Sequence, residues 1–270
     1  MRPILLLFIN LLWLGCTQPA SQTKADTGLS FLSFDQTRIA YTDEGKGDAV
    51  ILIHGFISNG SSWNKTVLKQ SLLDAGYRVI VPDLRGNGRS DRPQTPEAYQ
   101  NDAEIKDLMA LADHLSLSAY TATGYSRGSI VLAKLLTLDT RIQQAVIGGM
   151  GSDFTNPGWD RRIAFADAFS GRAELSDLTR GAVEYAQSID ADIKALGLLQ
   201  DYQPVTTPAE LQAVQIPVLI ICGDQDRDNG DPAELQKYLP GSQLTIVAGD
   251  HNNTYKQANF AEAVLDFLTK

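Results

Sequence analysis

Short apolar runs alternate along the chain with longer segments in which apolar residues recur every three or four positions. The short runs predict strands, and the longer segments predict amphipathic helices. The predicted strands are residues 29–34, 38–42, 49–53, 78–81, 120–123, 144–148, 216–222 and 243–247. The predicted helices are residues 62–74, 97–115, 127–138, 232–239 and 255–269.

A strand followed by a helix repeats through most of the chain, which requires parallel strands joined by crossover helices. Residues 49–53 (AVILI) are continuously apolar, as is typical of a strand buried on both faces of a sheet. The first two strands are separated by Asp35-Gln36, which predicts a hairpin and antiparallel strands at one sheet edge. The predicted fold is therefore α/β, with a doubly wound, mostly parallel sheet.

The alternation breaks after Gly151. Residues 160–199 contain helical stretches and no strand candidate, and the strand pattern resumes at 216–222. This predicts a small helical cap of about residues 151–207, inserted between the sixth and seventh strands. Such an insertion would lie over the carboxyl ends of the strands, where open α/β sheets place their ligand sites.

The first residues have the composition of a targeting segment. Arg2 is followed by the apolar run 4–14, which is too short to span a bilayer comfortably. Residues 1–15 are therefore predicted to be a signal peptide. The run leads into Gly15-Cys16, which resembles a bacterial lipoprotein signal and implies that Cys16 is lipidated.

Residues 16–28 are polar after the cysteine and predict a flexible linker to a folded domain of residues 29–270. Trp13 departs from the lipoprotein pattern, which usually has an aliphatic residue there. An ordinary signal peptide, cut after Ala20, is the alternative. Both interpretations predict export to the bacterial envelope, and the first also predicts attachment to a membrane that faces the periplasm or exterior.

Composition and charge narrow the range of partners. The 270 residues are 43% hydrophobic and 20% charged, which is ordinary for one large globular domain. The formal charge of −9 argues against nucleic acid or anionic lipid as the main partner. We expect a small-molecule substrate, and membrane contact only through the N-terminal anchor. Cys222 lies in an apolar run and is predicted to be a small buried hydrophobe.

The pentapeptide Gly-Tyr-Ser-Arg-Gly at residues 124–128 follows a predicted strand and opens a predicted helix. A sharp strand-to-helix turn needs small residues on both sides of its centre, because the backbone there is crowded. Free N–H groups at the helix start also favour negative charge nearby. Ser126 is therefore the candidate nucleophile. The alternative is a serine that merely caps the helix.

A serine hydroxyl needs a general base to take its proton. The chain has three histidines. His114 lies at a polar position of a helix and is predicted to face solvent, and His54 at a strand end is predicted to orient a loop by hydrogen bonds. His251 follows the last strand and is the best candidate for the base.

Together these segments resemble the α/β-hydrolase superfamily over about residues 29–270. His54-Gly55-Phe56 is similar to the family's oxyanion segment, and residues 249–251 (Gly-Asp-His) are similar to the segment that carries the catalytic histidine. Residues 83–90 (DLRGNGRS) resemble the loop after the next strand in capped members, where Arg85 would pair with a carboxylate. The resemblance implies the chain order Ser, acid, His.

In this family the acid lies three residues after a glycine, which places it at Asp226, with Asp228 next. Asp224 belongs to the same group of carboxylates, and some members take the acid from the position of Asp153. Asp250 adjoins His251, but consecutive side chains rarely reach one another.

The resemblance also implies an oxyanion hole formed by the backbone N–H groups of Phe56 and Arg127. Aromatic residues of the insertion are candidates to line an acyl pocket: Trp159, Phe165, Phe169 and Tyr185. Neither a metal-ligating spacing of histidines nor a Gly-x-Gly-x-x-Gly fingerprint occurs, so no metal or other cofactor is expected.

The predicted function is a serine hydrolase that cleaves a carboxylic ester of a small or medium molecule through an acyl-enzyme on Ser126. Amide, peptide, thioester or carbon–carbon bond hydrolysis with the same triad stays open. Epoxide hydrolases and haloalkane dehalogenases of this fold use an aspartate nucleophile, so Ser126 argues against both. A ligand-binding protein without catalysis, built on the same scaffold, is the alternative from another class.

Overall fold

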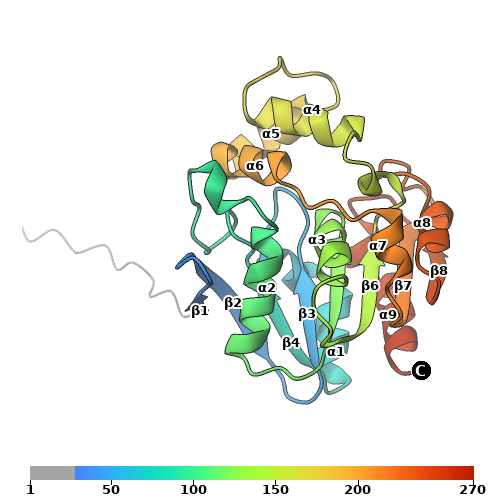
Figure 1. The fold of residues 1–270 in the computed structure, drawn as a ribbon. Coiled ribbons are helices and arrows are strands. Elements are labelled where there is room, and N and C mark those ends of the chain that lie inside the picture. The colour runs from blue at the N-terminus through green and yellow to red at the C-terminus, as the bar shows by residue number, and fades with distance from the viewer. Residues whose placement is uncertain (1–27) are drawn as a thin grey trace, which may run out of the picture.

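The computed structural model describes residues 28–270. The predicted signal peptide, Cys16 and all but the last residue of the predicted linker lie outside the described residues. Eight strands form one sheet in the order β1-β2-β4-β3-β5-β6-β7-β8 (Figure 1). Their bounds are Leu29–Leu32 for β1, Arg38–Glu44 for β2, Ala49–Ile53 for β3, Arg78–Pro82 for β4, Tyr120–Tyr125 for β5, Ile142–Gly148 for β6, Val218–Gly223 for β7 and Ser242–Val247 for β8.

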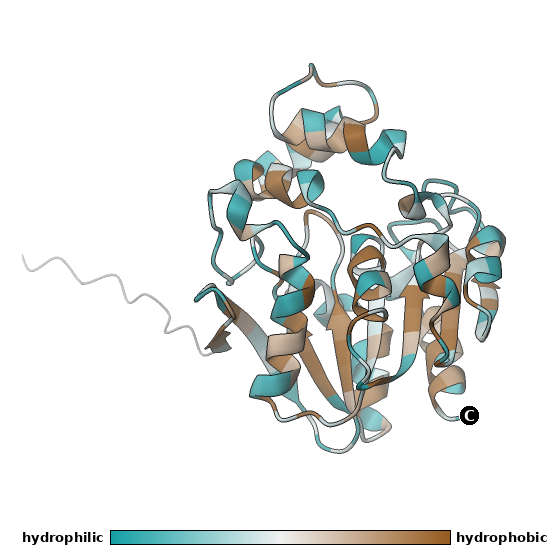
Figure 2. Ribbon diagram, viewed as in Figure 1, coloured by the Kyte–Doolittle hydropathy of each residue, from teal (hydrophilic) through white to brown (hydrophobic). Residues whose placement is uncertain are grey.

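The β1–β2 and β2–β4 pairs are antiparallel, and the strands from β4 to β8 pair in parallel. This confirms the predicted mostly parallel sheet with antiparallel strands at one edge. Every residue of β3, β5 and β7 is buried, because helices cover both faces of the sheet. Figure 2 shows the corresponding concentration of hydrophobic residues in the strands.

Two hydrophobic cores lie on opposite faces of the sheet, and alternate residues of β3 supply them. Ile51 and Ile53 belong to the core beneath α2, α3 and α8. Val50 and Leu52 belong to the core beneath α1 and α9. The bounds are Val67–Asp74 for α1, Ala103–His114 for α2, Arg127–Leu135 for α3, Pro232–Tyr238 for α8 and Ala258–Leu268 for α9.

Between β6 and β7 the chain forms helices α4 (Asp160–Phe169), α5 (Arg180–Ser188), α6 (Ile193–Asp201) and α7 (Pro208–Gln212). Figure 1 shows α4, α5 and α6 beyond the end of the sheet, whereas α7 lies beside it near α8. We refer to α4, α5 and α6 as the insertion helices. They share a small core that also includes Tyr99 of the main domain.

Several predicted helices are shorter or divided because the backbone leaves helical geometry at particular residues. Predicted helix 62–74 is a 3₁₀ turn, Gly60–Lys65, followed by α1, because extended Thr66 caps α1 by accepting a hydrogen bond from the Lys69 N–H. Helix α2 begins at Ala103 because Asn101 and Asp102 have positive φ angles. The remaining 3₁₀ turns are Pro96–Ala98, Asp153–Thr155 and Thr254–Lys256.

A buried arginine fixes the loop that follows β4. Arg85 has a fully buried side chain and donates hydrogen bonds to Asp107 of α2 (2.6 Å) and to Asp35 of the β1–β2 turn (2.9 Å). The expected pairing of Arg85 with a carboxylate is therefore present. Within residues 28–270, none of the helices has the length and apolarity needed to cross a bilayer.

Candidate active site

Ser126 lies at the turn between β5 and α3, with φ of 54° and ψ of −126°. This region is rarely adopted by residues other than glycine. Its N–H donates to the carbonyl of Gly148 at 2.9 Å, which holds the turn against β6. A Cβ on Gly124 would lie 2.4 Å from the backbone oxygen of Gly128, so a larger residue at position 124 would push the turn apart.

His251 contacts Ser126 through one ring nitrogen and Asp226 through the other. Nε2 lies 2.9 Å from Ser126 Oγ, and Nδ1 lies 2.7 Å from Asp226 Oδ2. Asp226 follows β7 and His251 follows β8, so the parallel strands bring three distant segments to one edge of the sheet. With the proton on Nδ1 donated to Asp226, Nε2 is free to accept the Ser126 hydroxyl proton.

Within the described part of the chain, the other candidate acids do not hydrogen-bond to the His251 ring. Asp228 is exposed and lies 3.8 Å from Arg161. Asp224 accepts a hydrogen bond from the Gly249 N–H, and Asp250 accepts from N–H groups of its own turn. Within the described residues, Asp226 is the carboxylate that hydrogen-bonds to His251, and Asp153 has no such contact.

Two neighbours that sequence reasoning did not identify hold the imidazole in place. The Tyr125 hydroxyl donates to the His251 carbonyl at 2.8 Å, and burial raises the pKa of Tyr125, which keeps it a donor. Asn229 donates to the Gly149 carbonyl at 3.2 Å and lies against the His251 ring. Tyr125 had a local sequence signal, because it lies inside the pentapeptide, but Asn229 had none.

The segment His54-Gly55-Phe56 lies directly against Ser126. A Cβ on Gly55 would be 3.3 Å from the Ser126 Cβ. Within the described residues, the backbone N–H groups of Phe56 and Arg127 donate to no protein acceptor. Both residues line a cavity that also contains Ser126 and His251. Two unpaired donors beside the serine fit an oxyanion hole.

His54 holds this segment in place through hydrogen bonds, as the sequence predicted. Its Nε2 accepts from the Leu84 N–H at 3.1 Å, and its Nδ1 lies 2.9 Å from the Gly55 carbonyl. Burial lowers the pKa of His54, so the ring is neutral and Nδ1 donates. His114 is exposed, also as expected, and its ring stacks on Phe31.

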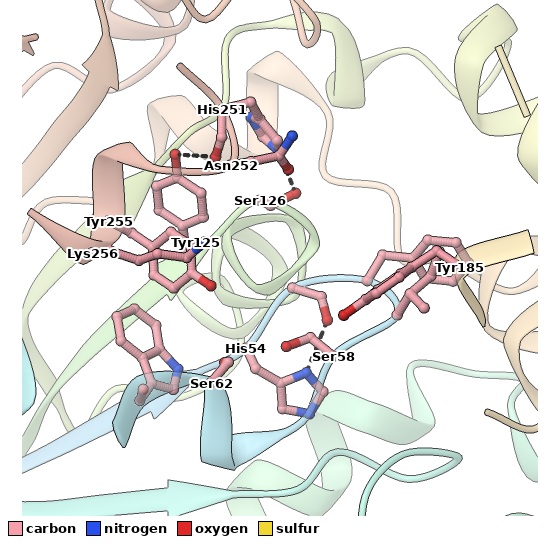
Figure 3. A pocket seen from close by; sticks show the side chains of 14 residues that line it. His54, Ser58, Ser62, Tyr125, Ser126, Tyr185, His251, Asn252, Tyr255 and Lys256 are labelled. Atoms are coloured by element: carbon pink, nitrogen blue, oxygen red, sulfur yellow. Dashed lines mark hydrogen bonds between the residues drawn. The ribbon is translucent and has the colours of Figure 1, made fainter. Parts of the chain in front are cut away.

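Two cavities meet at Ser126 and His251. The larger, about 250 Å³, is lined by Tyr125, Tyr255 and Lys256 on one side and by Tyr185 of α5 on the other (Figure 3). The smaller, about 80 Å³, lies between α3 and the insertion helices. Its lining includes Trp159 and Phe165, whereas Phe169 is buried against Phe56.

Cys222 is buried, and its thiol donates to the Met150 carbonyl at 3.4 Å. Burial raises its pKa to about 12, so it stays a thiol at neutral pH. Among residues 28–270, no group of three or more His, Cys, Asp or Glu side chains is arranged to hold a metal ion.

Comparison with known proteins shows the family to which this chain belongs. The model of the α/β-hydrolase fold family matches residues 48–170. A non-heme chloroperoxidase from Kitasatospora aureofaciens is 37% identical in an alignment that covers 87% of this chain and 98% of that protein. The chain belongs to the α/β-hydrolase family.

Solved structures with the same fold also match most of this chain. A bromoperoxidase from Bacillus anthracis is 26% identical, has a TM-score of 0.71 and matches 90% of this chain and all of that one. An esterase from Exiguobacterium antarcticum has a TM-score of 0.73 at 20% identity, matches 90% of this chain and all of that one, and shows the shared fold. The chain is thus similar in sequence to proteins named chloroperoxidase and bromoperoxidase, and it shares its fold with an esterase.

Proposed function

We propose that the protein is a serine hydrolase that cleaves a carboxylic ester of a small or medium molecule. The observation that carries this proposal is the chain of hydrogen bonds from Ser126 through His251 to Asp226. This order of groups activates a serine hydroxyl, and a ligand-binding protein has no need of it.

In the proposed reaction, Ser126 Oγ attacks the ester carbonyl carbon while His251 Nε2 takes its proton. The negative charge that develops on the carbonyl oxygen is stabilised by the N–H groups of Phe56 and Arg127. Buried Asp226 stabilises the imidazolium ion. The alcohol leaves with the proton from Nε2, and water then hydrolyses the acyl-enzyme with His251 again acting as base.

The test is hydrolysis of p-nitrophenyl esters of graded chain length, alongside amide, thioester and lactone substrates. Ser126→Ala is expected to lower kcat/KM at least about a thousandfold. A fluorophosphonate probe is expected to label Ser126 in the wild type. Ser118→Ala, at an exposed loop position, is the control and should keep full activity. A wild-type protein that resists the probe, with ligand binding intact in Ser126→Ala, would indicate a non-catalytic binding protein.

A second candidate reaction is suggested by the relatives named chloroperoxidase and bromoperoxidase. Hydrogen peroxide in place of water would convert the acyl-enzyme to a peracid and release Ser126. The peracid would then oxidise a halide ion and return to the carboxylic acid. The test is bromination of a dye. Bromination that requires peroxide, acetate and Ser126 would support this reaction. Bromination that persists in Ser126→Ala would contradict it.

A further inference from the structure

The smaller cavity is lined both by Ser126 and His251 and by polar groups of the insertion. These are Arg162 of α4 and Gln203, which follows α6. A volume of about 80 Å³ has room for two or three groups of the size of a water molecule. The cavity therefore suits a compact substituent that is close to the scissile bond.

Positive charge dominates this cavity. Arg162 donates to the Gln203 carbonyl at 2.8 Å, and within the described residues no carboxylate lies within ion-pair distance of it. Asp201, whose charge acts on Arg162, is held by Arg172 at 2.9 Å. Burial and the nearby guanidinium of Arg127 both lower the pKa of Arg162, as expected of a cation with too little compensating charge.

The remaining charges near the cavity do not cancel that of Arg162. Arg127 is neutralised by Glu104. Arg161 lies 3.8 Å from exposed Asp228 and stacks over the Phe165 ring. The carboxylate of the triad is already hydrogen-bonded to the imidazole.

Two buried donors of the cavity lining have no hydrogen-bond partner in the described structure. Gln203 is 4% exposed, yet its Nε2 has no hydrogen-bond partner in the described structure. The Nε of Arg127, another lining residue, is also buried without a partner. Buried donors without acceptors destabilise a protein, and an acceptor inside the cavity would relieve that cost.

We infer that this cavity binds a carboxylate of the substrate, so that the preferred ester carries a negative charge close to the scissile carbonyl. Arg162 would supply the charge, and Gln203 would donate to a carboxylate oxygen. A guanidinium fork matches a carboxylate in shape as well as charge. This inference rests on the proposed ester hydrolysis and names its substrate class.

Two pairs of esters, each with an anionic and a neutral member, test the proposed carboxylate site. Mono-p-nitrophenyl succinate and its methyl ester differ in charge on the acyl side, and 4-acetoxybenzoate and its methyl ester differ on the alcohol side. The wild type is expected to prefer the anionic member of one pair by about tenfold to a hundredfold in kcat/KM. Arg162→Gln should remove the preference for the anionic ester, while Arg162→Lys should keep part of it.

Gln203→Leu provides a second variant, because it removes an already unpaired donor and should reduce the preference without loss of folding. Arg180→Gln is the matched control, since Arg180 is an exposed arginine of α5 outside the cavity lining. Equal rates for both members of each pair, with neutral esters cleaved normally, would overturn the carboxylate site and leave the proposed hydrolase intact.

A binding measurement tests the carboxylate site separately from the proposed ester hydrolysis. Calorimetry with Ser126→Ala should detect monomethyl succinate and not its uncharged amide, and the additional change Arg162→Gln should abolish the signal. If no ester is cleaved but this binding is present, ester hydrolysis fails and the carboxylate site stands. If the wild type prefers neither anionic ester and no binding is detected, the carboxylate site is wrong.

Discussion

Ser126 has a backbone conformation that costs about 1–3 kcal/mol relative to an ordinary turn, as is usual for non-glycine residues at positive φ. The surrounding structure compensates through the hydrogen bond to Gly148 and through close packing of Gly124 and Gly128. The result is a hydroxyl directed toward His251 Nε2 instead of into the helix. The sequence predicted this turn because glycines lie two positions before and two positions after the serine.

Asp226→Asn is the sharpest test of the proposed acid. An asparagine amide donating to Nδ1 would place the imidazole proton on Nε2, where it cannot accept the Ser126 proton. We expect kcat/KM for an ester to fall by about 10⁴. Asp228→Asn is the control and should change kcat/KM by less than about threefold. An active Asp226→Asn with an inactive Asp228→Asn would contradict the assignment.

At the scale of elements, β3 and α3 approach so closely that only glycine fits between them. A Cβ on Gly128 would lie 2.3 Å from the Ile53 carbonyl oxygen and 2.7 Å from that of His54. Both oxygens belong to backbone and cannot turn aside. The same contact helps to fix where the segment His54-Gly55-Phe56 lies relative to Ser126.

Gly128→Ala is therefore expected to lower the free energy of unfolding by about 2 kcal/mol and also to lower esterase activity. The measurements are urea denaturation and kcat/KM. Gly181→Ala, in α5 with no atom within 4 Å of the added Cβ, should leave stability unchanged or raise it. Equal stabilities for the two variants would show that the close approach is not a constraint.

Element types were predictable, whereas several boundaries were not. The continuous apolar runs that became β3 and β7 have few alternatives, because they must be buried on both faces. The start of α2 was predicted too early, since periodicity does not reveal the left-handed backbone at Asn101 and Asp102. Helix α7 is short and was not predicted at all.

At the scale of the molecule, one buried ion pair ties the insertion to the main domain. Arg127 of α3 makes two hydrogen bonds to Glu104 of α2, at 2.8 and 2.5 Å, and a third to the Leu199 carbonyl of α6 at 2.9 Å. Both charged side chains are about 95% buried. Sequence reasoning considered Arg127 only for its backbone N–H.

Glu104→Gln would leave the Arg127 guanidinium buried without its counter-charge. We expect a loss of about 3 kcal/mol in unfolding free energy. Asp113→Asn removes an exposed partner of Arg141 and should cost less than about 1 kcal/mol. Chemical denaturation of both variants checks this, and similar losses for the two would mean that the buried pair does not stabilise the link.

Local patterns along the chain were enough to predict the alternating architecture, the turn at Ser126 and the short set of candidate partners. These depend on local periodicity, on small residues at a crowded turn, and on the scarcity of histidine. Which carboxylate contacts His251 depends on the folded turn after β7, because Asp224, Asp226 and Asp228 differ only in where that turn directs them. It also decided the polarity of the smaller cavity. Arg162 and Gln203 come from separate parts of the insertion, and within residues 28–270 the fold gives Arg162 no carboxylate partner and Gln203 Nε2 no acceptor.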